Sequence, residues 1–243
     1  MFKFSVFVAT TLAVGLSSGA QASVWEATLD QSNTGGFFPD NTPYLSVLIR
    51  DGADASGYDL GGYTATSSDV VFTVSALTAP DSVAGNNYGI QKFSFNTIHP
   101  RADFAANGSN FILPDGWGLS NGGNAGGFGK FDIKLGTTGS HRLDSLSFAI
   151  TNIAGDGAVD YFALSDGNAG EGNFFFAVHL AGFDASQTNG ISSSWFAGAS
   201  GEPGGADYPL ALLQPVPVPA ALWLLGSGMA LFATAGARQK CKA

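Results

Sequence analysis

A serine in the predicted body of this 243-residue sequence fits a catalytic motif. It is Ser120, in the segment Gly118-Leu119-Ser120-Asn121-Gly122, which fits the Gly-x-Ser-x-Gly pattern of serine hydrolases. That chemistry needs a sharp turn from a strand into a helix beneath the serine. The residues that follow are rich in glycine and asparagine and predict a loop, so we predict no catalytic residue.

Three histidines, His99, His141 and His179, are the remaining candidates for acid–base or metal chemistry. They lie far apart and do not have metal-ligand spacing. His99 precedes a proline in a predicted turn, and His141 begins a predicted strand. In the alternating run around it, His179 lies on the face opposite to Phe174, Phe176 and Val178. A structural role is the favoured interpretation of each, and no metal site is predicted.

Two groups of carboxylates lie in predicted turns and offer the oxygen ligands that calcium prefers. The first group is Asp51, Asp54 and Asp59, and the second is Asp156, Asp160, Asp166 and Glu171. Neither fits the spacing of an EF-hand loop or of a nine-residue calcium repeat. Ordinary turn carboxylates are therefore favoured and no cofactor is predicted. Calcium is the alternative, and a calcium-dependent melting temperature would support it.

Four aromatic residues lie near predicted turns: Tyr58, Tyr63, Trp117 and Trp195. Such rings can stack on sugars, as they do in lectins with a sandwich fold, or they can form the edge of a hydrophobic core. The sequence leaves both interpretations open.

The elements that must position these side chains are short strands. In residues 128–135, Phe131, Ile133 and Leu135 share one face while Lys130, Asp132 and Lys134 share the other, which is the pattern of a half-buried strand. Similar runs occur at 44–49, 70–77, 91–96, 145–153, 159–164 and 173–180, with shorter ones at 24–29 and 111–113. These runs predict an all-β fold, an antiparallel two-sheet sandwich of jelly-roll type, with a barrel as the second choice.

Composition narrows the range of partners. Residues 23–210 hold six Lys or Arg and nineteen Asp or Glu, a net charge of −13 against −9 for the whole chain. Nucleic acid and anionic membrane surfaces are not expected as partners of this part of the chain, because both favour a basic surface. The only cysteine is Cys241, so this part of the chain cannot form a disulfide.

The N-terminal 22 residues have the pattern of a secretory signal peptide. Lys3 precedes an apolar stretch at 4–16, and the small residues around Ala20 and Ala22 predict cleavage after them. We expect residues 23–200 to form the exported all-β domain.

The C-terminus has the pattern of a membrane anchor. A linker at 201–215 precedes an uncharged apolar segment at 216–237, which as a helix would reach about 33 Å and span a bilayer. The tail at 238–243 then carries three basic residues, Arg238, Lys240 and Lys242. Because basic residues stay on the cytoplasmic side, the tail is expected in the cytoplasm and the β domain in the periplasm.

Residues 216–228, Val-Pro-Val-Pro-Ala-Ala-Leu-Trp-Leu-Leu-Gly-Ser-Gly, followed by apolar residues and a basic end, resemble the PEP-CTERM sorting signal. The resemblance is to the variant branch with the motif Val-Pro-Leu-Pro-Ala, and the matching motif residues are Pro217, Val218, Pro219 and Ala220. It implies recognition by an exosortase, a membrane protease that cuts at or near the prolines.

Together these features predict an exported envelope or extracellular-matrix protein with a non-enzymatic role linked to exopolysaccharide or biofilm. The expected partners are an exosortase, the inner membrane before processing, and exopolysaccharide. Two alternatives stay open: a carbohydrate-binding module and a secreted hydrolase.

Overall fold

The computed structural model describes residues 24–105, 108–167 and 170–198. The predicted signal peptide, linker, apolar C-terminal segment, sorting motif and basic tail all lie outside the described residues. Within the described ranges, no helix has the length and apolar character needed to cross a membrane.

The described chain is all-β, as predicted. Its strands are β1 (Val24–Ser32), β2 (Leu45–Arg50), β3 (Val70–Ala76), β4 (Ala84–Phe95), β5 (Phe111–Ile112), β6 (Trp117–Asn124), β7 (Lys130–Thr137), β8 (Ser145–Ile150), β9 (Phe176–Phe183) and β10 (Ser193–Gly198). The helical elements are single turns: α1 (Gly52–Ala55), α2 (Thr78–Asp81), η1 (Arg101–Asp103), η2 (Gly139–His141) and η3 (Ala158–Tyr161). The predicted alternation in β7 is confirmed, because Phe131, Ile133 and Leu135 are buried while Lys130 and Asp132 are exposed.

Three local predictions are wrong. Residues 159–164 do not form a strand, because the Asp160 carboxylate accepts the Gly157 amide at 3.0 Å and the chain coils into η3. Ser120 does not precede a loop; it lies inside β6, which pairs with β7 from Trp117 to Asn124. His141 ends η2 and does not begin a strand.

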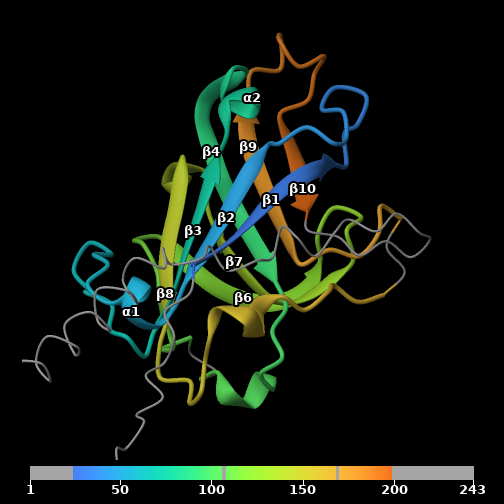
Figure 1. Cartoon of the computed structure of the whole chain (residues 1–243). Coiled ribbons are helices and arrows are strands. Elements are labelled where there is room, and N and C mark those ends of the chain that lie inside the picture. Colours follow the sequence, from blue (N-terminus) through green and yellow to red (C-terminus); the bar gives the residue numbers. More distant parts are fainter. Residues whose placement is uncertain (1–23, 106–107, 168–169, 199–243) are drawn as a thin grey trace, which may run out of the picture.

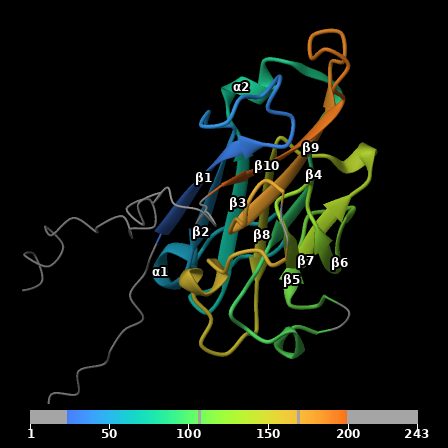
Figure 2. The ribbon, with the colours of Figure 1, turned by 90° about the vertical axis from the view of Figure 1, so that its right-hand side faces the viewer.

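All ten strands join into one antiparallel sheet in the order β5-β8-β3-β2-β1-β10-β9-β4-β7-β6. The edge strands β5 and β6 are neighbours in sequence, joined by residues 113–116. Laid flat, ten strands would place the two edges about 43 Å apart. The connection reaches at most about 18 Å. The sheet must therefore curl, and Figures 1 and 2 show it doing so.

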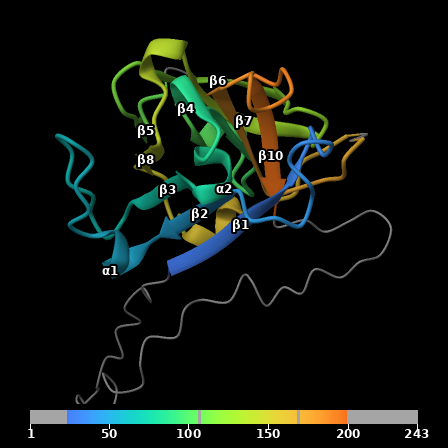
Figure 3. The ribbon, with the colours of Figure 1, turned by 90° about the horizontal axis from the view of Figure 1, so that it is seen from above.

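The curled sheet is close to a barrel, with its strands arranged around the interior when seen from above (Figure 3). The two separate sheets of the predicted sandwich are not confirmed, because hydrogen bonding passes continuously from β5 to β6. The interior is filled largely by aromatic rings. Phe72 stacks on Phe148 with 4.7 Å between ring centroids, and the Tyr161 ring meets Phe72 edge-on at 5.1 Å.

Strand direction places several connections at one end of the barrel. Each step across an antiparallel sheet reverses direction, so β2, β10, β4 and β8, which are separated by even numbers of steps, run the same way. The segments that follow β2, β4 and β8 therefore leave at the same end, together with the start of β1 and the end of β10. Figure 1 shows α1 and the connections after β4 and β8 at the lower end of the molecule.

Candidate functional site

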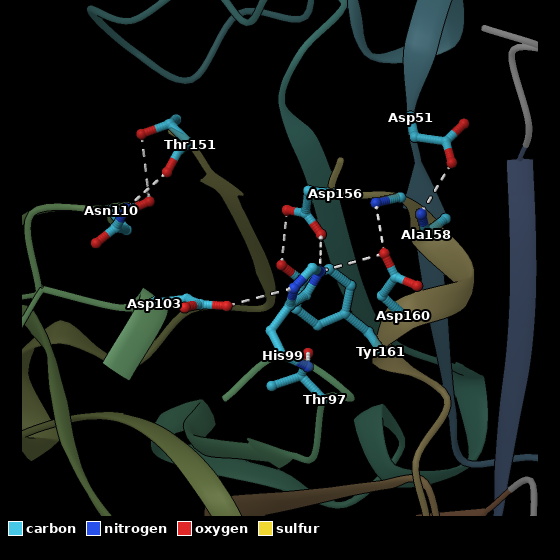
Figure 4. A network of polar contacts seen from close by, with 11 residues as sticks. Asp51, Thr97, His99, Asp103, Asn110, Thr151, Asp156, Ala158, Asp160 and Tyr161 are labelled. Atoms are coloured by element: carbon cyan, nitrogen blue, oxygen red, sulfur yellow. Dashed lines mark hydrogen bonds and ion pairs between the residues drawn. The ribbon is translucent and has the colours of Figure 1, made fainter. Parts of the chain in front are cut away.

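At this end of the barrel, three side chains from two distant segments form a cluster (Figure 4). His99 lies in the connection after β4, and Asp156 and Asp160 lie in and beside η3, after β8. His99 Nε2 lies 3.2 Å from Asp156 Oδ1 and 3.2 Å from Asp160 Oδ2. We call these three residues the His–Asp cluster. Its ligand-type atoms lie within 4.8 Å of one another.

Neighbouring groups fix each member of the His–Asp cluster. The Tyr161 hydroxyl donates to Asp156 Oδ2 at 2.8 Å, and because the Tyr161 ring is buried in the core it holds the carboxylate in place. The Gly157 amide donates to Asp160 Oδ2, and the His99 amide donates to Thr97 Oγ1 at 3.1 Å. Asp103 Oδ2 lies 3.8 Å from the other ring nitrogen of His99.

Burial dominates the electrostatics of the His–Asp cluster. The side chain of Asp156 is 1% exposed, and those of His99 and Asp160 are 14% exposed. Burial raises the pKa of Asp156 to about 6, although the Tyr161 hydroxyl and the nearby His99 lower it in part. Asp156 Oδ1 has no hydrogen-bond partner. The cluster therefore places two carboxylates in a largely buried position, with too few hydrogen-bond donors for their oxygens.

The sequence placed Asp156 and Asp160 in one acidic group, but the structure brings only these two of its four residues together. Asp166 lies elsewhere, where its backbone pairs with Lys130, and Glu171 lies beside the turn at Gly127. The other acidic group is also split. Asp51 accepts the Ala158 amide at 2.8 Å and so supports η3, whereas Asp59 caps a turn at Gly61.

The role of His99 was missed from the sequence. It stands 57 residues before Asp156, and no spacing rule for metal ligands covers such a separation. The signal that could have found it is topological, since β4 and β8 end on the same side of the sheet. Comparison with protein-family models, with curated proteins and with solved structures gave no match.

The other candidate residues lie away from the His–Asp cluster. The Ser120 hydroxyl donates to the Lys134 carbonyl at 3.1 Å from within a strand, so Ser120 is not at the turn that a hydrolase serine requires. His141 is exposed in η2, where its Nδ1 lies 2.9 Å from Ser140 Oγ. His179 faces the outside of β9, opposite to Phe176 and Val178 as predicted.

The four predicted aromatic residues already have partners within the fold. Trp117 is buried and its Nε1 donates to the His141 carbonyl at 3.0 Å. Trp195 lies beside the His179 ring, with 4.9 Å between centroids. Tyr58 shares hydrogen bonds with Thr73 and Ser147, and the hydroxyl of Tyr63 donates to Asp69. The core-edge interpretation therefore suits all four.

A groove of about 600 Å³ runs over β4, β6 and β7 on the outside of the sheet. It is lined by Lys92, Trp117, Leu119, Ser120, Lys134, Thr137 and Thr138 and by the glycines 116, 118 and 136. Two lysines and three hydroxyls in one groove make a cationic, hydrogen-bonding surface on an otherwise acidic body.

Proposed function

We propose that this chain is an exported envelope or extracellular-matrix protein that carries a PEP-CTERM-type sorting signal. Its β domain has a structural or binding role, associated with exopolysaccharide or biofilm, and is not an enzyme. The observation that carries the proposal is the order of three features at the C-terminus: the Pro217–Ala220 motif, the apolar segment 216–237 and the basic tail.

Each feature has a physical task in this proposal. The signal peptide at 1–22 starts export, and the apolar segment stops it because that segment is stable in the hydrocarbon core. The basic tail stays in the cytoplasm. An exosortase then cuts at or near Pro217 and Pro219, which moves the domain from the inner membrane to the surface or the medium.

The arrangement of the β domain is compatible with such an anchor. The first and last described strands, β1 and β10, are antiparallel neighbours, with Leu29 opposite Gly198. On its other side β1 pairs with β2, where Val24 lies opposite Arg50. Val24, which begins β1, and Gly198, which ends β10, therefore both lie toward the end of the barrel where β2, β4 and β8 end. The start of β6 and the end of β7, which line the groove, lie toward the opposite end of the barrel.

Processing can be tested with a double variant in the native host. We expect Pro217→Ala/Pro219→Ala to stay in the inner-membrane fraction while the wild-type domain is released. Pro203→Ala/Pro209→Ala is the matched control, because these prolines precede the motif, and it should be released normally. Normal release of the first variant, or unprocessed chain dissolved in the cytosol, would show that the sorting proposal is wrong.

The groove favours a second candidate function, a carbohydrate-binding module. Lys92 and Lys134 flank it in a body with net charge −13, so an acidic saccharide would be bound in preference to a neutral one. We expect Lys92→Gln/Lys134→Gln to abolish binding of a uronic-acid polysaccharide to the full chain, and Lys130→Gln, outside the groove, to preserve it. Trp117 is a poor test residue, because its burial means that substitution would damage the fold.

A further inference from the structure

We infer that the His–Asp cluster binds a first-row divalent metal ion of the Zn²⁺ class. The inference is independent of the sorting proposal and adds a ligand site at the end of the barrel where β4 and β8 end. The ligand atoms would be His99 Nε2, Asp156 Oδ1 and Asp160 Oδ2.

Both spacings that involve His99 Nε2 fit one ion, and all three atoms lie within 4.8 Å of one another. Zinc binds imidazole nitrogen and carboxylate oxygen at about 2.0–2.2 Å, which places neighbouring ligand atoms about 3.0–3.5 Å apart in tetrahedral or octahedral geometry. Both distances from His99 Nε2, to Asp156 Oδ1 and to Asp160 Oδ2, are 3.2 Å. The side chains therefore need little movement to share an ion.

The cluster also lacks a donor or cation for one of its carboxylate oxygens. If the imidazole is neutral and its Nε2 carries the lone pair, that nitrogen is an acceptor facing two further acceptors, the carboxylate oxygens, and no hydrogen bond can form. A protonated ring carries one Nε2 hydrogen, and the geometry aims this atom at Asp160 Oδ2 in a hydrogen bond. Asp156 Oδ1, on a side chain 1% exposed, is then left without a donor. A divalent ion would satisfy all three atoms at once.

Surrounding contacts orient the ligands as the outer groups of metal sites do. The Tyr161 hydroxyl occupies Asp156 Oδ2 and leaves Oδ1 free, and Asp103 lies on the Nδ1 side of His99. Removal of such outer partners commonly weakens metal binding about 10- to 100-fold.

The ligand set selects the kind of metal. Calcium takes six to eight oxygen ligands, whereas imidazole suits zinc and its first-row neighbours. Of the two calcium candidates drawn from the sequence, the one that contains Asp156 and Asp160 also included Asp166 and Glu171, which lie elsewhere. Three protein ligands with His99 and Asp160 partly exposed leave coordination positions for water.

The test is a titration of the full-length chain, purified in detergent and stripped with chelator, with Zn²⁺. Calorimetry and metal analysis after dialysis should give one tightly bound ion per chain. Asp156→Asn, Asp160→Asn and His99→Gln should each raise the Kd at least tenfold. Co²⁺ should give absorption bands in the wild type that these variants lack, a readout that a purely structural role would not produce.

Matched controls separate this site from other ligands. Asp166→Asn and Glu171→Gln remove carboxylates outside the cluster, and Cys241→Ser and His141→Gln remove other zinc-binding groups, so all four variants should bind as the wild type does. Circular dichroism in chelator identifies any variant that fails to fold, and His99→Gln, at a partly exposed position, keeps the test available if Asp156→Asn does not fold. No zinc bound by the wild type, binding unchanged in all three cluster variants, or calcium bound in preference to zinc would overturn the inference.

Discussion

Two histidines of the same domain have opposite surroundings. His99, at the end of the barrel, lies among the carboxylates of Asp103, Asp156 and Asp160. His179, on the outside of β9, lies near Lys92 and Arg142, and burial together with these cations lowers its pKa to about 4. One imidazole is thus placed to share a positive charge, and the other is held neutral.

The chemistry of each histidine in this domain is therefore set by strand order. His179 belongs to a basic face, which we define as Lys92, Lys134, Arg142 and His179, on β4, β7 and β9 and in the segment before β8. Arg142 donates to the Asn87 carbonyl, so its charge is held close to the sheet. Residues 23–210 have a net charge of −13, so a basic face is an exception on this domain. It exists because strands that are distant in sequence pair with one another.

The largest expected effect concerns how the His–Asp cluster is joined to the core. Tyr161→Ala should lower the free energy of unfolding by about 3–5 kcal/mol, because it removes a buried ring that packs on Phe72. Tyr161→Phe keeps the ring and loses only the hydrogen bond to Asp156, at a cost of about 1 kcal/mol. Urea unfolding of the full chain in detergent with chelator measures both, and equal losses would mean that ring packing does not anchor the cluster.

The second prediction concerns pH and the basic face. The folded pKa of His179, about 4, lies below the usual 6.5, so between these values the unfolded chain binds a proton that the folded chain does not. Above pH 6.5 the residue contributes no pH dependence. As pH falls from 6.5 to 4, it should cost up to about 3 kcal/mol of stability.

The variant His179→Gln should lack this part of the pH dependence, because glutamine does not titrate. His141→Gln, at an exposed position, is the control for loss of an imidazole. Urea unfolding of the three proteins at pH 7 and pH 4.5 gives the comparison. If the free energy of unfolding changes equally with pH in the wild type and in His179→Gln, the proposed contrast between the two histidines is wrong.

A smaller loss of stability is expected at Gly126, whose backbone packs on Trp195 beside His179. Gly126 has φ of +60°, and a Cβ there would lie 2.4 Å from Trp195 Cγ, so Gly126→Ala forces the ring away from His179. Gly61→Ala has a similar φ of +72° but open space around it, and controls for backbone strain. We expect Gly126→Ala to cost about 2 kcal/mol more than Gly61→Ala. Equal losses would show that Trp195 is free to move.

The smallest effect tests the cations themselves. Lys92→Gln should raise the pKa of His179 toward its usual value, because one of the cations that oppose protonation is gone. At pH 5 the stability gain should stay below about 1 kcal/mol and should shrink in high salt, since Lys92 is partly exposed. Lys130→Gln is the charge-matched control. NMR titration of His179 measures the change, and an unaltered pKa would mean that Lys92 does not help to keep this ring neutral.

The sequence by itself determined the local features of this protein. Alternation in residues 130–135 identified β7 and its buried face, because side chains in a strand alternate between faces. The same reasoning failed at 159–164, where the carboxylates of Asp51 and Asp160 accept hydrogen bonds from backbone amides and so stabilise η3. Composition also showed that the body is acidic and lacks cysteine.

Only the tertiary structure decided how distant segments meet. The pattern of strands is compatible with a sandwich or a barrel, and the choice depends on the short connection between the edge strands β5 and β6, which forces one sheet to curl. The meeting of His99 with Asp156 and Asp160 depends on the even number of steps between β4 and β8. Hydrophobic periodicity reports which face of a strand is buried, whereas strand order is set by pairing across the whole chain, which no local pattern encodes.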